Sequence, residues 1–235
     1  MPTHNQSGVF RRRHLPHWDV EGHAYFITGC LHGSIPALGL QRIRQYRREL
    51  ERQKRPSRFS PEEWLDEIEK RVFVFTDQLL DQKSPVSHLR DDLQAEVVQN
   101  AFLHFAGTRY KLFAFVVMPS HHHWVCLPDA KWSIDVTRGQ TNRTPREIIS
   151  HSIQSYTSNR CNFIRGSSGK YWQDETFDHW IRDENQLIRV IDYIEDNPVV
   201  AGLTRLPEEY RWSSAAFRKL HGIPKGSPLN HPPAP

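Results

Sequence analysis

The segment Val116–Leu127 reads VVMPSHHHWVCL, and the other expected elements can be arranged around it. Apolar residues dominate positions 110–118 and return at 124–127, and the turn-forming pair Pro119-Ser120 separates these two runs. Short apolar runs on either side of a turn are typical of two paired strands. The segment therefore predicts a β hairpin in the middle of the chain, with three histidines opening its second strand.

The three consecutive histidines, His121 to His123, are the first candidate functional residues. Side chains alternate between the two faces of a strand, so His121 and His123 share one face and His122 points to the other. Two strand steps place the Cα atoms of His121 and His123 about 7 Å apart. Imidazoles at that spacing can lean together onto a metal ion or a phosphate. The alternative is a histidine-rich turn whose rings bind neighbouring backbone groups, because H-x-H is a short motif.

The composition is typical of a globular protein with a charged surface. A chain of 235 residues and 27.6 kDa suits one large domain, or one domain with an insertion. A content of 37% hydrophobic and 11% aromatic residues is enough for a core, and the mean hydropathy is −0.66. The net charge of +4 and the pI of about 9.0 favour an anionic partner, with nucleic acid ahead of a membrane surface.

The three cysteines, Cys30, Cys126 and Cys161, are scattered and show no CxxC spacing. This pattern argues against a disulfide scaffold and against a cysteine zinc site, and it fits a reducing cytoplasm. The longest apolar run is far shorter than the roughly 20 residues that a membrane span requires. We therefore expect a soluble cytoplasmic protein with no membrane partner.

The remaining elements follow from periodicity and capping signals. Strands are expected at 24–31 and 177–182, helices at 41–58, 60–80, 91–106, 144–163 and 183–197, and a loop at 128–143. Ser60 with Glu63 and Thr144 with Glu147 have the spacing of capping boxes. The last helix is expected to stop before Pro198, because a helix usually ends ahead of proline.

This order of elements predicts an α+β fold with one antiparallel sheet and helices on one face. A single domain is expected at 15–221, with a helical insertion after the first strand at about 35–90. Residues 1–14 are expected to form a basic N-terminal arm. Residues 222–235 contain five prolines and are expected to form a tail.

Positive charge is concentrated in the segment 41–58, which carries eight Arg or Lys and two Glu, a local charge of +6. The candidates for phosphate contact there and in two other basic segments are Arg11, Arg12, Arg13, Arg44, Arg47, Arg48 and Lys170. The alternatives are a solvated helix face and a disordered terminus. Bases could stack on Trp18, Trp172 and Trp180, although a core position is the commoner role of tryptophan.

The last expected helix adds a second candidate group. At 100° per residue, Leu187, Ile191 and Ile194 share an apolar face, and Tyr193 and Asn197 lie one turn apart on its shoulder. A phenol and a carboxamide at the edge of a core can face a site. Alternatively, Tyr193 is a boundary residue with its hydroxyl in water, and Asn197 ends the helix.

Several ordered motifs resemble those of the REP-associated tyrosine transposases, single-tyrosine members of the HUH nuclease class. They are RRRHLPHW and AYFITGCL near the start, MPSHHHW in the middle, and then WQDETFDHWIRDENQL, DYIEDNPVVAGL and YRWSSA. The resemblance covers roughly residues 11–215 and is loose over 40–90. It implies the HUH nuclease fold, whose antiparallel sheet is ferredoxin-like and RRM-like.

The resemblance also implies residue roles. His121, His123 and Asn197 take the places of the metal ligands, and Tyr193 takes the place of the nucleophile. The metal would be Mg²⁺ or Mn²⁺, since both suit mixed nitrogen and oxygen ligands. His122 departs from the family, which usually has Val, Met or Leu at that position.

The activity implied by the resemblance is cleavage and rejoining of single-stranded DNA at hairpins through a 5′-phosphotyrosine. The protein would act as a monomer or homodimer in the cytoplasm, associated with the nucleoid. One alternative is a domesticated protein that binds hairpin DNA without strand transfer. Another is a metal-dependent hydrolase that uses His121 and His123 with an activated water. The sequence ranks the hydrolase lower, because no carboxylate-rich metal site is apparent around the hairpin.

Overall fold

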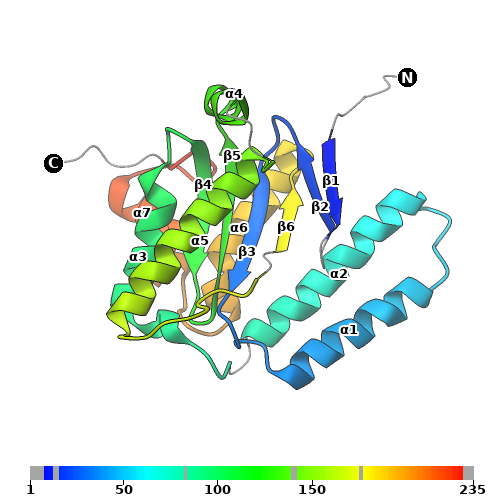
Figure 1. Ribbon diagram of the computed structural model, residues 1–235, viewed down its shortest axis with the longest axis horizontal. Helices are drawn as coiled ribbons and strands as arrows, with labels where there is room; N and C mark the ends of the chain where they lie inside the picture. Colours follow the sequence, from blue (N-terminus) through cyan, green and yellow to red (C-terminus); the bar gives the residue numbers. More distant parts are fainter. Residues whose placement is uncertain (1–7, 13–15, 82–83, 139–141, 175–176, 230–235) are drawn as a thin grey trace.

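The computed structural model describes residues 8–12, 16–81, 84–138, 142–174 and 177–229. Its centre is a four-stranded antiparallel sheet in the order β4-β5-β3-β6 (Figure 1). The strands are β3 Tyr25–Cys30, β4 Tyr110–Val117, β5 His121–Pro128 and β6 Phe177–Trp180. The predicted central hairpin is β4–β5. It occupies one side of the sheet, and β5 pairs with β3 so that Cys30 is opposite His121.

Two helices cover one face of the sheet, namely α3 Asp92–His104 and α5 Pro145–Ile164 (Figure 1). Their side chains Phe102 and Ile149 lie in one buried cluster with Ile27, Leu112 and Trp124 of the strands. The order strand, helix, strand, strand, helix, strand is the ferredoxin-like arrangement. The predicted α+β fold with a ferredoxin-like antiparallel sheet is confirmed.

Helices also cover the opposite face, so the expectation of helices on one face describes α3 and α5 alone. There α6, Glu184–Val200, packs Ile191 and Ile194 against Phe26 and Val125 of the strands. The second half of α2, Pro61–Asp81, joins this cluster. Burial of both faces explains why most positions of the hairpin strands outside the three histidines are apolar instead of alternating with polar residues.

Between β3 and α3 the chain forms a helical hairpin of α1, Ala37–Arg52, and α2 (Figure 1). Its own small core is made by Leu50, Trp64, Ile68 and Val72, with Ile43, Tyr46 and Phe59 packed against it. The predicted capping box at the start of α2 is confirmed, because the Glu63 amide donates to Ser60 Oγ and the Ser60 amide donates to Glu63 Oε2. The first half of α2 therefore packs on α1, and its second half packs on the sheet.

Three segments differ from the sequence predictions. Within the predicted arm, Gly8–Arg12 is strand β1 and pairs antiparallel with β2, Pro16–Val20. Residues 1–7 and 13–15 lie outside the described chain. The predicted loop 128–143 contains helix α4, Ala130–Arg138, because Asp129 caps its first turn. Helix α6 continues past Pro198 to Val200, since Pro198 lies in its last turns, where a missing amide costs one hydrogen bond.

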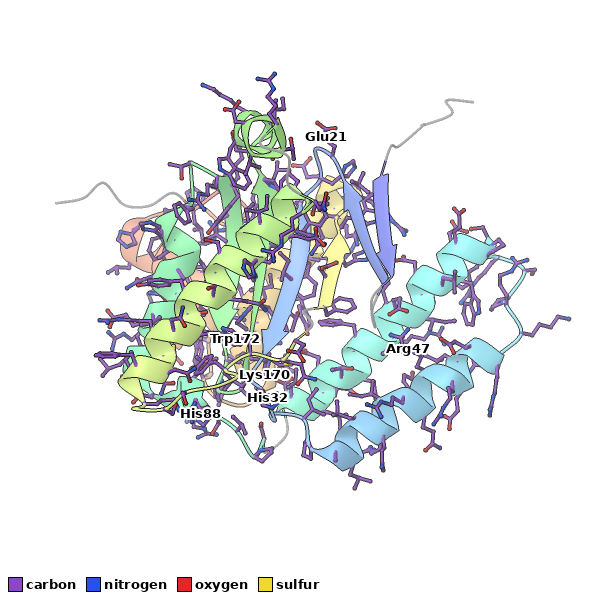
Figure 2. All side chains as sticks on the ribbon, viewed as in Figure 1. Glu21, His32, Arg47, His88, Lys170 and Trp172 are labelled. Carbon is purple, nitrogen blue, oxygen red and sulfur yellow. The ribbon has the colours of Figure 1, made fainter. Side chains whose placement is uncertain are left out.

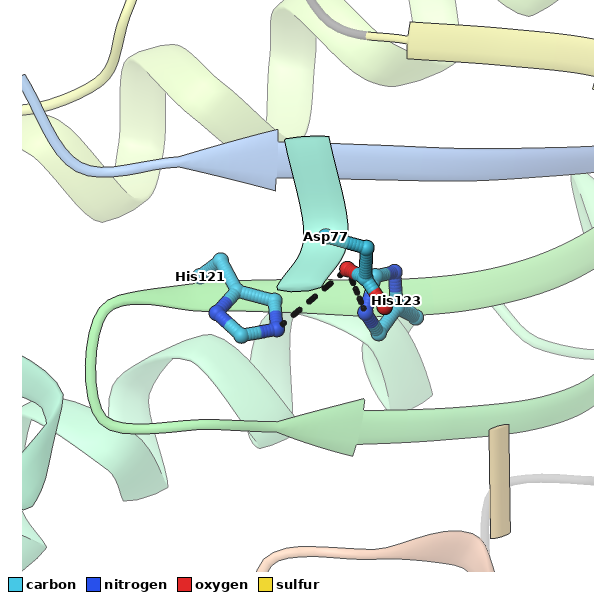
Figure 3. A group of neighbouring side chains, drawn as sticks. All are labelled: Asp77, His121 and His123. Carbon is cyan, nitrogen blue, oxygen red and sulfur yellow. Dashed lines mark ion pairs between the residues drawn. The ribbon is translucent and has the colours of Figure 1, made fainter. Parts of the chain in front are cut away.

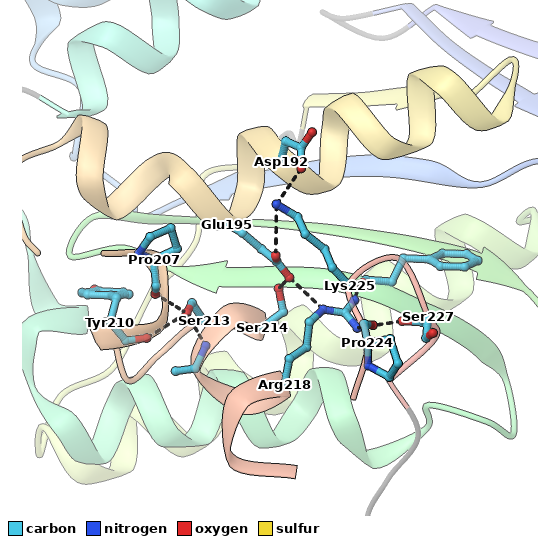
Figure 4. A network of polar contacts seen from close by, with 12 residues as sticks. Asp192, Glu195, Pro207, Tyr210, Ser213, Ser214, Arg218, Pro224, Lys225 and Ser227 are labelled. Atoms are coloured by element: carbon cyan, nitrogen blue, oxygen red, sulfur yellow. Dashed lines mark hydrogen bonds and ion pairs between the residues drawn. The ribbon is translucent and has the colours of Figure 1, made fainter. Parts of the chain in front are cut away.

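The predicted tail is partly integral to the fold. Helix α7, Ser214–His221, is followed by residues up to Leu229, whose fully buried side chain and backbone contact β4. Arg218 of α7 holds this region together (Figure 4): its guanidinium pairs with Glu195 of α6 and donates to the carbonyls of Pro224 and Ser227. Buried polar partners late in the chain have no periodic signal, so composition alone suggested a tail.

Within the described part of the chain, every helix is too short or too polar to cross a membrane.

His122 packs on the α3–α5 side of the sheet, as the strand alternation predicts. Its ring centroid lies 5.2 Å from that of Phe102 and 4.9 Å from that of Trp172, and neither ring nitrogen has a hydrogen-bond partner. Gly29 on β3 lies directly below, and a Cβ atom there would come within 2.5 Å of His122 Nε2. The imidazole therefore occupies space that only a glycine on the neighbouring strand leaves open.

We expect Gly29→Ala to destabilise the protein by about 1–3 kcal/mol, because the new methyl group overlaps the His122 ring. In the His122→Val background the same change should cost less, since the smaller side chain leaves room. A double-mutant cycle of urea unfolding measures the coupling. Additive effects of the two substitutions would show that the overlap does not limit stability.

Removing Glu195 should leave the Arg218 guanidinium buried without its carboxylate partner, because the side chains of Glu195 and Arg218 are only 4% and 6% exposed. We expect Glu195→Ala to lower the free energy of unfolding by about 3–5 kcal/mol. The control is Asp192→Ala, which breaks the half-exposed Asp192–Lys225 pair and should cost less than about 1 kcal/mol. Equal losses in chemical denaturation would contradict a special role for the buried pair.

Candidate functional site

Strand β5 positions the paired histidines. His121 and His123 project to the face covered by α2 and α6, and their ring centroids lie 4.8 Å apart. Both rings are buried, and the ring of His123 stacks on Phe26 of β3. The predicted alternation of the three histidines is confirmed, with His122 on the other side of the sheet.

Asp77 of α2 completes a group that could hold a metal ion (Figure 3). Its Oδ1 atom lies 3.1 Å from His123 Nε2 and 3.8 Å from His121 Nε2. One ligand atom from each of the three residues lies within 4.8 Å of the others, and all three residues are buried. Asp81, one turn further along α2, places Oδ1 3.9 Å from His121 Nε2.

Hydroxyl groups orient both imidazoles. Ser120 Oγ donates to the Leu80 carbonyl and lies 3.0 Å from His121 Nδ1, while Thr28 Oγ1 lies 2.7 Å from His123 Nδ1. When Nδ1 carries the proton and donates a hydrogen bond to the hydroxyl, the Nε2 lone pair faces Asp77. The Nε2 atoms and Asp77 Oδ1 are all buried with no hydrogen-bond partner. Such a set of orphaned acceptors fits a cation.

The protonation of the site agrees with this fit. Burial, together with neighbouring His123, lowers the pKa of His121 to about 3, so the ring is neutral and able to ligate. Burial raises the pKa of Asp77, whereas positive charge on His123 and His121, together with the Tyr193 hydroxyl, holds this pKa well below its usual range. When the imidazoles are neutral, a bound cation would supply that positive charge. The pKa of Asp81 is raised to about 6, by burial and then by Asp77.

Helix α6 brings Tyr193 to the same carboxylate. The Tyr193 hydroxyl donates to Asp77 Oδ2, and its ring packs edge-on against Phe26 and against His123 at a centroid distance of 5.6 Å. Burial and then Asp77 raise the pKa of Tyr193, while a hydrogen bond with Asn197 opposes the rise. Asn197 itself is buried, and its Oδ1 atom has no hydrogen-bond partner. Coordination by Asn197 stays a prediction.

The carboxylates of Asp77 and Asp81 were missed by the sequence predictions, because no carboxylate-rich site is apparent from the residues around the hairpin. They belong to α2, which precedes the hairpin by a whole helix and had been assigned to an insertion. A signal was present, because Asp77 interrupts a buried stripe that runs through Val72 and Leu80. An acidic residue on the buried face of a helix requires a partner.

The predicted DNA contacts on α1 fall into two groups. Arg44 and Arg48 are exposed and lie one turn apart on the helix. Arg47, labelled in Figure 2, forms a bidentate ion pair with Glu69 and so links α1 to α2. The role of Arg47 seen here is therefore structural, and DNA contact by Arg44 and Arg48 stays a prediction.

The other predicted DNA contacts are placed only in part. Lys170 is exposed and forms a 2.6 Å ion pair with Asp174. Trp172 belongs to the core, where its Nε1 donates to Thr157, so it is not available for base stacking. Arg11 and Arg12 belong to strand β1, and Arg13 lies outside the described residues.

Comparisons with known proteins reveal a likeness of fold. No protein-family model matches the chain, and no curated protein matches it. The chain is similar to a solved structure described as "Structure of the REP associates tyrosine transposase bound to a REP hairpin", with a TM-score of 0.50 over 96% of this chain and 94% of that chain. The two sequences are 15% identical, so the likeness establishes a shared fold.

Proposed function

We propose that this protein is a metal-assisted endonuclease and strand transferase of single-stranded DNA that acts through a covalent phosphotyrosine. The observation that carries the proposal is the contact of the Tyr193 hydroxyl with Asp77, whose other oxygen faces His121 and His123. A nucleophile beside a group of metal-ligand atoms is an arrangement suited to metal-assisted phosphodiester cleavage by tyrosine.

The reaction itself is a transesterification. The Tyr193 hydroxyl gives up its proton as its oxygen forms a bond to phosphorus, the P–O3′ bond breaks, and the departing 3′ oxygen takes up a proton. The products are a 5′-phosphotyrosyl adduct and a free 3′-hydroxyl, which can attack again to rejoin an end without ATP. The phenol has an ordinary pKa near 10, which is raised further here, so Tyr193 is protonated at neutral pH before the reaction. Its hydrogen bond to Asp77 orients the hydroxyl.

The metal would be held by His121, His123 and Asp77, with Asn197 as a predicted further ligand. Nitrogen and oxygen donors of this kind suit Mn²⁺ or Mg²⁺. When bound, the ion supplies polarisation of the scissile phosphate and stabilisation of the charge that develops on it. The residues of the chain orient the ion and the tyrosine and keep the site shielded by the sheet, α2 and α6.

The proposed substrate is a DNA hairpin with a flanking single strand. The support is the fold likeness to a transposase whose structure contains a REP hairpin, together with the sequence motifs and the basic helix α1. Exposed Arg44 and Arg48 are the proposed phosphate contacts.

A second candidate function is a metal-dependent hydrolase that uses water as the nucleophile. The observation that favours it is the pair of carboxylates, Asp77 and Asp81, beside the histidines. A hydrolase would release its product without a protein-linked intermediate and would not need Tyr193. A protein that binds hairpins without strand transfer would give no product at all.

We expect Tyr193→Phe to abolish the covalent adduct on labelled hairpin DNA in the presence of Mn²⁺, while binding of the hairpin remains. The control is Tyr156→Phe, because Tyr156 lies exposed on α5 and should leave the adduct unchanged. Denaturing gels measure the adduct, and mobility shifts measure the binding.

An undiminished adduct in Tyr193→Phe would refute the assignment of the nucleophile. Cleavage without any adduct in the unmodified protein would favour the hydrolase. Tight binding with no product in either Mg²⁺ or Mn²⁺ would favour a binding protein.

We expect Arg44→Gln and Arg48→Gln each to weaken hairpin binding and to reduce the slope of log K against log salt by about 1. Arg47→Gln is the matched control, because its guanidinium is paired with Glu69. The Arg47→Gln control should lower the thermal unfolding temperature and leave the salt slope unchanged. Fluorescence anisotropy across a salt series measures these slopes, and unchanged slopes for Arg44 and Arg48 would exclude α1 from the DNA interface.

A further inference from the structure

Asp77 is a carboxylate in the interior of the protein. It is 6% exposed on the face of α2 that packs against the sheet. Oδ2 accepts a hydrogen bond from the Tyr193 hydroxyl, but the buried Oδ1 atom has no hydrogen-bond partner. Taking a carboxylate out of water without a full set of partners costs several kcal/mol. A cation at Oδ1 would remove this cost.

A second carboxylate and the helix itself add to the negative potential. Asp81 ends α2, and its Oδ1 atom is also buried without a hydrogen-bond partner. The last turn of α2 contains no basic residue. The carboxyl end of a helix carries a partial negative charge, which disfavours nearby carboxylates. Asp77, Asp81 and the helix end thus direct negative potential at the Nε2 atoms of His121 and His123.

Helix α2 links this position to the rest of the α1–α2 hairpin. In its second half, the ring centroid of Phe73 lies 5.3 Å from that of Phe26 of the sheet. Near its end, the Leu80 carbonyl accepts a hydrogen bond from Ser120 Oγ. Toward its start, Trp64 packs in the core shared with α1. A bond at Asp77 would therefore connect the sheet to a helix that carries α1.

We propose that Asp77 is a metal ligand supplied by the inserted helix, and that metal binding fastens the basic α1–α2 hairpin to the sheet. This inference rests on the metal centre of the proposed function and deepens it, because it gives the ligand from α2 a structural consequence. The coupling is reciprocal, so DNA that holds the α1–α2 hairpin in place also strengthens metal binding.

The test compares Mn²⁺ binding to the full chain and to Asp77→Asn, which preserves the size of the side chain and an acceptor for Tyr193. Titration calorimetry should show Mn²⁺ affinity reduced at least about tenfold in Asp77→Asn and lost in His121→Ala/His123→Ala. Glu67→Gln is the matched control, because Glu67 is a surface carboxylate of the same helix paired with Arg71. That control should bind Mn²⁺ like the unmodified protein.

A second readout follows the helix. In the unmodified protein, Mn²⁺ should slow hydrogen exchange of the backbone amides over residues 72–81 and raise the thermal unfolding temperature. In Asp77→Asn both effects should be absent. The unfolding temperatures of the two metal-free proteins are the baselines for this comparison.

Unchanged Mn²⁺ affinity in Asp77→Asn, or Mn²⁺ binding that leaves exchange in α2 unaffected, would overturn the inference. The adduct assay on unmodified protein decides the proposed function separately. A protein that forms the Tyr193 adduct but binds Mn²⁺ without Asp77 would keep the function and lose the inference.

Discussion

A single buried carboxylate, that of Asp77, brings three distant parts of the chain together. It accepts the Tyr193 hydroxyl from α6, it lies 3.1 Å from His123 on β5, and it belongs to the helix inserted after β3. A carboxylate in the interior is tolerated only with compensating partners. That requirement links the nucleophile candidate to the histidine pair and sets how α2 must sit on the sheet. The arrangement of the site is in this sense an electrostatic condition that three elements satisfy jointly.

The sheet supplies the rigidity on which this condition depends. Both faces of β4 and β5 are buried, one by α3 and α5 and the other by α6 and α2. Hydroxyl groups at the two ends of the histidine pair, Ser120 and Thr28, hold each imidazole in one orientation. The buried pair of Glu195 and Arg218 fixes α6 from its far side, so Tyr193 is held by contacts on both sides of its helix.

The likeness to a hairpin-bound transposase is a likeness of fold, at 15% identity and a TM-score of 0.50. The chemical argument therefore depends on the residues of this chain. Here the donor set combines two imidazoles with a carboxylate from α2, and the opposite face of the sheet has a buried histidine, His122, packed against Gly29. These features distinguish the site from the pattern of two histidines and an amide that the motifs suggest.

Local signals in the sequence determined much of the framework. The turn at Pro119-Ser120 between apolar runs predicted the central hairpin, strand alternation predicted the opposed directions of His121 and His122, and helical spacing placed Asn197 one turn from Tyr193. Tertiary structure alone decided which helix covers the second face of the sheet, that Asp77 joins the histidines, and that Arg47 pairs with Glu69. It also showed that Leu229 is part of the core. The physical reason is that periodicity records which side of an element is buried, whereas the partner of a buried charge depends on contacts between residues far apart in the chain.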